Sequence, residues 1–355
     1  MEPVIIDGSE GEGGGAMLRQ ALGLSMLLGK PFVMENIRVG RKNPGLSWQH
    51  LTALNAAHQA CDARVEGNQI GSMTVSFAPG KLEKTRLSLD IGTAGSVTLL
   101  LQAFLLPALF SGQEFRLAVK GGTDVAWSIP ADYFSNVLLP QLKKYADASL
   151  LVRKRGFYPK GGGEVLFTSK GRYAFGEGLP RIALLEQGDV FKVGGLSCAS
   201  SFLQPSRVAE RQASSARLSL ARLGVPVDVM MNYLQTLSPG SYLVLWVVCG
   251  GEEGLDMENP VLLGASALGE RSLRAESVGE AAAKDLRETL MSGAACDEHL
   301  ADQLIPIMAL TGGKLRTSKI SRHARSNVYV AEQFLDVLFV VDEERNIISC
   351  EPASA

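Results

Sequence analysis

The residue best suited to covalent chemistry is His323, one of four histidines in this 355-residue chain. It stands in the segment Ser321-Arg322-His323-Ala324-Arg325-Ser326-Asn327, at the expected entrance to a helix. Arginines and helix N-termini both favour phosphate groups, and a neutral imidazole can act as a nucleophile. The alternative is an ordinary structural histidine, a reading we keep for His58 because it lies among alanines inside a predicted helix.

Two further segments could hold phosphate. The run Gly11-Glu12-Gly13-Gly14-Gly15 precedes a predicted helix and could offer backbone N–H groups to an anion, although glycines in a tight turn need no ligand. Arg38, Arg41 and Lys42 form a basic loop whose alternative is a solvated surface. The sequence contains no P-loop motif and no dinucleotide-binding glycine motif between a strand and a helix, which excludes those two classes.

Composition narrows the remaining classes. The formal net charge of -2 means that any nucleic-acid contact must come from a local cluster of Arg and Lys. Five cysteines without a Cys-x-x-Cys pair argue against a disulfide framework or a zinc site and fit a reducing cytoplasm. The longest apolar run, Val97 to Phe110, is too short for a membrane span, which needs about 20 residues. We therefore expect a cytoplasmic protein without a membrane partner.

The elements that must position these residues form a repeat. The first unit reads as a strand at residues 4–7, the glycine-rich turn, a helix at 17–28, a strand at 32–39, a helix at 48–61 and a strand pair. The same order returns from Asp90, about 83 residues after Asp7, with helices expected at 97–106 and 132–145. A period of this length favours duplicated α+β modules rather than a solenoid.

A third copy follows residue 295, with helices expected at 297–310 and 327–334, and its first strand is not evident. Residues 186–294 have a different order of predicted strands and helices, and we interpret them as an inserted α/β domain. The sequence thus predicts an α+β fold in which residues 1–185 and 295–355 form a large domain of three modules. Corresponding loops of the modules hold Arg41, Asp124 and His323, which would converge on one cleft if the modules pack around a common axis.

The segment Arg155-Gly156-Phe157-Tyr158-Pro159-Lys160-Gly161-Gly162-Gly163-Glu164-Val165 resembles the signature of the RNA 3′-terminal phosphate cyclases. Other pieces of that pattern follow in order along nearly the whole chain. They are Asp7-Gly8 with the glycine run and Leu18-Arg19, Ile37 to Arg41, Pro44 to Leu46, Gln49 to Leu51, Thr93 to Ser96, Gly121 to Asp124, and Leu300 to Leu304. The resemblance implies three βαβαββ-type modules with a smaller α/β domain inserted before the third.

The resemblance also implies an activity: ATP-dependent conversion of an RNA 3′-phosphate to a 2′,3′-cyclic phosphate. His323 matches the histidine that carries AMP, and Glu12 matches the residue that meets the ATP-bound Mg²⁺ (or Mn²⁺). The positions that match the AMP pocket are Pro130, Tyr133, His299, Asp302 and Gln303, and those that match contacts to the RNA end or to phosphates are Arg19, Arg38, Arg41 and Gln49. The chain departs from the pattern at His299, where tyrosine is usual, at Ala16, and in the loop residues Ser47-Trp48 and Val125-Ala126-Trp127.

Two alternatives stay open. A ribosome-biogenesis factor with the same fold lacks the adenylated histidine, so His323 counts against it. An enolpyruvyl transferase would need two three-module domains, which the unlike insert does not supply. The physiological RNA, the use of DNA or 5′-phosphate ends, the role of the insert and the oligomeric state do not follow from the sequence.

Overall fold

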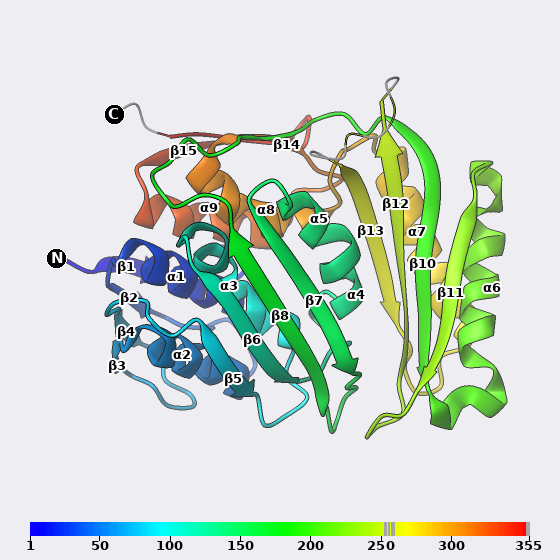
Figure 1. Cartoon of the computed structure of the whole chain (residues 1–355), viewed down its shortest axis with the longest axis horizontal. Coiled ribbons are helices and arrows are strands. Elements are labelled where there is room, and N and C mark those ends of the chain that lie inside the picture. Colours follow the sequence, from blue (N-terminus) through cyan, green and yellow to red (C-terminus); the bar gives the residue numbers. More distant parts are fainter. Residues whose placement is uncertain (252–253, 255, 257–259, 353–355) are drawn as a thin grey trace.

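The computed structural model describes residues 1–251, 254, 256 and 260–352. A large domain, on the left of Figure 1, is joined to a smaller one on the right. None of the helices in the described ranges combines the length and the apolar character that crossing a membrane requires.

The first module has the order strand, helix, strand, helix, strand, strand. Its elements are β1 (Val4–Asp7), α1 (Gly15–Leu28), β2 (Phe32–Glu35), α2 (Trp48–Cys61), β3 (Arg64–Glu66) and β4 (Val75–Ala78). The sheet order is β1-β2-β4-β3, with β1 parallel to β2 and the other pairs antiparallel. The expected strand at 32–39 is shorter than predicted, because Asn36 and Arg38 have left-handed backbone.

The second module repeats this topology. Its elements are β5 (Arg86–Asp90), α3 (Val97–Phe110), β6 (Glu114–Gly121), α4 (Ala131–Tyr133), a π-helical segment (Phe134–Leu138), α5 (Leu139–Leu142), β7 (Ala146–Lys154) and β8 (Gly163–Gly171). The sheet order β5-β6-β8-β7 matches that of the first module strand for strand. The single helix expected at 132–145 is thus divided by a π-helical segment and ends at Leu142.

The third module has the same topology, and its first strand lies before the insert. Its elements are β9 (Ile182–Leu184), α8 (Glu298–Thr311), β14 (Gly313–Arg316), α9 (Arg322–Phe334), β15 (Val337–Asp342) and β16 (Ile347–Pro352). The sheet order is β15-β16-β14-β9, and β9 pairs in parallel with β14. The insert therefore interrupts this module after its first strand, which refines the expectation that it precedes the module.

The insert is an α/β unit with its own core. It contains β10 (Asp189–Ser200), α6 (Val208–Leu220), β11 (Val227–Leu234), β12 (Ser241–Gly250), β13 (Val261–Leu268) and α7 (Ala275–Met291), with short 3₁₀ turns at Ser201–Ser206 and Ala221–Leu223. The sheet order is β11-β10-β12-β13, and α6 and α7 cover one face. α6 begins at Val208, because Arg207 before it has left-handed backbone.

Helices from all three modules meet at the centre of the large domain. α1 packs against α3 and α9, and α8 packs against α3 and α9. α3 is buried on nearly every side, which explains why its sequence is almost continuously apolar rather than amphipathic. This packing brings the N-terminal ends of α1 and α9 together, although they come from opposite ends of the chain.

Candidate active site

His323 lies in the first turn of α9, not in a loop as predicted. The helix begins at Arg322 because Ser321 caps it: the Ser321 hydroxyl accepts a hydrogen bond from the backbone N–H of Ala324 at 2.8 Å. The expectation that the helix starts at Asn327 is therefore wrong by more than one turn. The earlier start fixes the backbone that carries the imidazole.

The glycine-rich loop of the first module meets this helix directly. His323 Nε2 lies 2.7 Å from Glu12 Oε2, and the other Glu12 carboxylate oxygen accepts a hydrogen bond from Arg41. The backbone N–H of Glu12 donates to Ser326 Oγ at 3.0 Å. Gly11 has a left-handed φ of +61°, and a Cβ there would overlap Ser326, so glycine is required for this approach.

Burial keeps the His323 ring neutral. Loss of solvent lowers the pKa of His323 below its usual 6.5, although the Glu12 carboxylate acts in the opposite direction. The positive charges of Arg19 and Arg41 lower it further. The ring is therefore unprotonated at neutral pH, which is the form that can attack an electrophile.

Arginine side chains lie near the pair formed by His323 and Glu12. Arg19, on α1, is 9% exposed and donates from Nε to Gln102 Oε1 at 3.0 Å. Burial lowers its pKa to about 10, partly offset by Glu12, so it remains a cation at neutral pH. Arg38 is half-buried and donates to the Gly45 carbonyl at 2.8 Å, while Arg41 is exposed. Arg19 and Arg41 act on His323, and Arg38 acts on Arg41; such a group of cations suits a ligand rich in phosphate.

The sequence analysis did not assign a role to His50, which the structure places beside these arginines. His50 Nδ1 lies 2.9 Å from Ser47 Oγ and accepts from the Ser47 backbone N–H at 3.1 Å, so Nε2 carries the proton of the neutral ring. Burial and the charges of Arg19 and Arg38 lower its pKa to about 3. Its Nε2 faces Gly15 at the start of α1. The Ser-x-x-His spacing of the helix cap was the signal in the sequence.

The residues that the resemblance assigns to AMP gather at the start of α4 and of α8. Asp302 is 6% exposed, and burial raises its pKa to about 7. Its Oδ1 accepts from Ser321 Oγ at 2.5 Å, which ties it to the cap of the helix that carries His323. Gln303, the next residue, is half-buried. The link through Ser321 places this part of the expected pocket next to His323.

The other expected pocket residues differ widely in exposure. His299 is exposed, whereas Pro130 and Tyr133 are buried. The rings of Tyr133 and His299 are 6.3 Å apart and meet edge to face. Tyr133 donates its hydroxyl to Asp297 Oδ1 at 2.6 Å. Tyr133 thus supports its neighbours from inside the protein, and a direct contact with a nucleotide stays a prediction.

Asp124 does not join the site around His323. It is buried beside Arg155, whose Nη1 lies 3.4 Å from Asp124 Oδ2 and whose Nη2 lies 2.8 Å from Asp132 Oδ1. Tyr242 of the insert donates its hydroxyl to Asp132. Of the three corresponding side chains, Arg41 and His323 converge through Glu12, whereas Asp124 pairs with Arg155, which also pairs with Asp132, the partner of Tyr242 of the insert.

The carboxylate that could contact a metal ion is Glu12. Among the residues that the structure describes, there is no group of three His, Cys, Asp or Glu side chains that could hold a metal. Mg²⁺ is commonly bound by one or two carboxylates together with phosphate oxygens. Glu12, which is partly exposed and adjacent to the arginines, fits that pattern as a single protein ligand.

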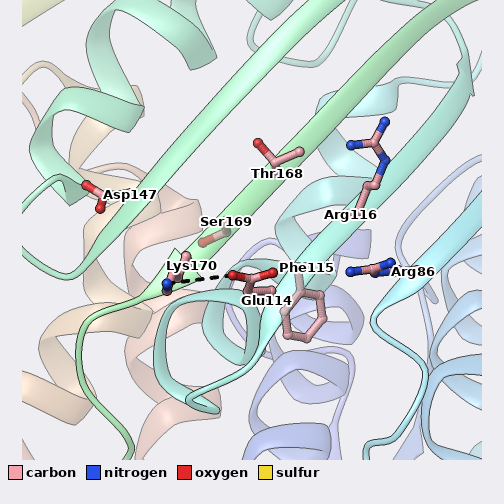
Figure 2. Close-up of a pocket in the computed structure, with 8 residues that line it drawn as sticks. All are labelled: Arg86, Glu114, Phe115, Arg116, Asp147, Thr168, Ser169 and Lys170. Atoms are coloured by element: carbon pink, nitrogen blue, oxygen red, sulfur yellow. Dashed lines mark ion pairs between the residues drawn. The ribbon is translucent and has the colours of Figure 1, made fainter.

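A shallow depression elsewhere contains none of the expected site residues. Figure 2 shows it on the sheet of the second module, where Lys170 pairs with Glu114 at 3.7 Å and Arg86 lies beside Arg116. Acidic and basic side chains are mixed there, so the surface has no strong preference for an anion. The chemistry of the chain is concentrated around His323.

Comparison with known proteins agrees with the geometry. A profile of the family described as RNA 3′-terminal phosphate cyclase matches residues 10–341. A protein of that name from Archaeoglobus fulgidus is 44% identical over 346 residues, which cover 97% of this chain and 99% of the relative. One from Pyrococcus furiosus is 41% identical and covers 95% of both chains, and one from Methanosarcina mazei is 40% identical. The chain therefore belongs to the RNA 3′-terminal phosphate cyclase family.

Proposed function

We propose that this protein uses ATP to convert an RNA 3′-phosphate into a 2′,3′-cyclic phosphate through a covalent histidine–AMP intermediate. The observation that carries the proposal is the placement of His323 against Glu12, which also pairs with Arg41, across two modules. Family membership supports the same activity. The five cysteines are free and buried, which supports a reducing compartment such as the cytoplasm.

The first step activates the nucleotide. An unprotonated ring nitrogen of His323 forms a bond to the α-phosphorus of ATP, the bond to the β-phosphate oxygen breaks, and diphosphate leaves with the electron pair. Arg19 and Arg41 stabilise the negative charge on the leaving diphosphate. Glu12 would hold Mg²⁺ (or Mn²⁺) together with the phosphates of the nucleotide, and the ion would neutralise further phosphate charge.

The next two steps transfer AMP and close the ring. An oxygen of the RNA 3′-phosphate attacks the same phosphorus and the bond to nitrogen breaks, which leaves AMP on the RNA end and a free histidine. The neighbouring 2′-hydroxyl then attacks the terminal phosphorus, loses its proton, and displaces AMP with its oxygen. Because both groups belong to one nucleotide, proximity supplies much of the rate enhancement.

The other expected residues bind and orient. Asp302 and Gln303, with His299 at the rim, are suited to the nucleoside, and Pro130 and Tyr133 support that pocket from the second module. Arg38 and Gln49, beside Arg19 and Arg41, are suited to the phosphate at the RNA end. The His299 imidazole is smaller than the usual tyrosine ring, so we expect weaker stacking on adenine.

The decisive experiment is incubation with magnesium and ATP labelled at the α-phosphate, followed by a denaturing gel. We expect a label on the protein that is labile in acid and stable in alkali, as a phosphorus–nitrogen bond requires. His323→Ala should abolish it. His58→Ala is the matched control, because His58 is an exposed residue near the end of α2.

A second assay follows RNA carrying a 3′-phosphate, which should become resistant to phosphatase as the cyclic end forms. A protein that is never labelled and never alters the RNA end would instead fit the alternative, a non-catalytic factor in ribosomal RNA processing. Labelling without cyclisation would limit the proposal to its first step.

A further inference from the structure

Two tryptophans are exposed in a chain that has only three. Trp127 is 97% exposed and Trp48 is 63% exposed, whereas Trp246 is half-buried on strand β12 of the insert. Tryptophan is usually well buried, because its ring removes a large apolar area from water. Trp48 and Trp127 are also two of the loop residues at which the sequence departs from its family pattern. Their exposure suggests a contact that the folded chain does not provide.

The two loops that carry these rings meet at one turn. Trp48 is the first residue of α2 and is followed by Gln49, and a Cβ at Gly95 would lie 3.6 Å from Gln49 Oε1. On the other side of this turn, a Cβ at Gly122 would overlap both Ala94 O and Val125, two residues before Trp127. Gln49 and Val125, close neighbours in sequence of Trp48 and Trp127, therefore flank the same turn at Ala94 and Gly95.

The backbone at Trp127 adds an independent observation. Its φ is +67°, in the left-handed region that bulky side chains avoid. Strained backbone of this kind is found mostly at functional sites, where the surrounding structure maintains it. The Trp127 ring makes almost no contact with its own chain that could offset this backbone strain. A role in binding would account for both the strain and the exposure.

Charge and ring chemistry together indicate the occupant. Arg38, Arg41 and Lys42 precede Trp48 and offer positive charge to a phosphate backbone. Unpaired bases stack on exposed aromatic rings with little regard to sequence, because every base has a π face. A nearly free ring such as Trp127 cannot form a wall of the buried nucleotide pocket. It suits a ligand that extends outward from the site.

We propose that Trp48 and Trp127 form a stacking platform for the unpaired bases next to the 3′-phosphate of the RNA substrate. The inference rests on the proposed function, which brings that end of the RNA to His323. It names the form of RNA that the site accepts: a single-stranded 3′ end, bound with little sequence preference.

The test uses tryptophan fluorescence of the full-length protein and an oligoadenylate with a 3′-phosphate as the probe. We expect the RNA to quench the emission of the wild type and of Trp246→Phe, and to leave that of the Trp48→Ala/Trp127→Ala double variant nearly unchanged. Each single alanine variant should weaken RNA affinity about tenfold, and each phenylalanine variant should retain most of it. An oligonucleotide whose last two bases are missing should bind the wild type as weakly as the double variant.

Labelling of His323 by ATP needs no RNA, so it tests the proposed function separately from the stacking platform. If the wild type is not labelled, the proposed function fails whatever the tryptophans do. If the double variant is labelled and still binds single-stranded RNA as the wild type does, only the platform is refuted. A raised KM for ATP with an unchanged RNA affinity would also refute it, by assigning the rings to the nucleotide. The platform would also be refuted if the double variant lost as much affinity for blunt duplex RNA as for single-stranded RNA.

Discussion

Replacing Asp302 by asparagine should make the folded protein more stable while it damages the site. Asp302 is 6% exposed, and burial raises its pKa to about 7, although the Ser321 hydroxyl and His299 act in the opposite direction. Above that pH the protein must hold a negative charge away from water. Asparagine has nearly the same shape, keeps an acceptor for Ser321 Oγ, and carries no charge.

The size of the effect follows from the pKa. An ordinary aspartate has a pKa of 3.8, and the difference from about 7 corresponds to about 4 kcal/mol at 1.36 kcal/mol per pH unit. Between these two values the folded chain binds more protons than the unfolded chain, so stability is lost as pH rises through this window. We expect Asp302→Asn to gain at least about 2 kcal/mol at pH 8, and to lose that advantage near pH 4.

Urea unfolding of both proteins at several pH values measures this difference, with labelling of His323 by ATP recorded in parallel. We expect weaker labelling from the more stable variant. Ser321→Ala is a comparison of opposite sign: it leaves the charge but removes both the hydrogen bond to Asp302 and the cap of α9, so we expect it to be less stable than the wild type. The reasoning is refuted if Asp302→Asn is no more stable than the wild type at pH 8, or if its advantage does not shrink in acid.

Three other predictions follow from the same geometry. Because burial lowers the pKa of His323 below 6.5, the labelling rate of Asp302→Asn, which lacks the carboxyl that titrates near pH 7, should stay level from about pH 8 to 6.5 and fall only in more acidic buffer; a decline in this variant that starts above pH 7 would contradict this. Arg155→Met should destabilise the protein by about 3–5 kcal/mol in urea, since it leaves the Asp124 and Asp132 carboxylates without their cation, and adding Asp124→Asn should recover part of the loss. Gly11→Ala should slow labelling severely, because its Cβ would push the loop of Glu12 away from α9, whereas Gly178→Ala, with open space around it, should not.

Much of the fold was predictable because its modules repeat a strong pattern. The helix expected at 48–61 is confirmed to the residue, and the one at 297–310 differs by one position because Asp297 is its cap. The first strand of the third module was missed, since β9 has only three residues and its partner β14 follows more than a hundred residues later. No local periodicity can reveal a pairing across an inserted domain.

The site was predicted less completely than the fold. The contact of Glu12 with His323 agrees with the expected grouping, whereas the neutral His50 and the cap at Ser321 depend on hydrogen bonds that residue types alone do not fix. The expected convergence of Asp124 with Arg41 and His323 does not occur, because a repeat alignment places loops at equivalent positions without determining which partner each side chain finds. For Asp124 that partner is Arg155.

The contact between Glu12 and His323 joins residues about 300 positions apart. During synthesis, Glu12 is therefore made long before its partner. At about 5–20 residues per second, a ribosome that has made Glu12 needs roughly 15–60 seconds to reach His323. Throughout that interval the glycine loop has no helix α9 to dock on. Under the proposed mechanism, chains that end before α9 would therefore be unable to consume ATP or to modify RNA ends.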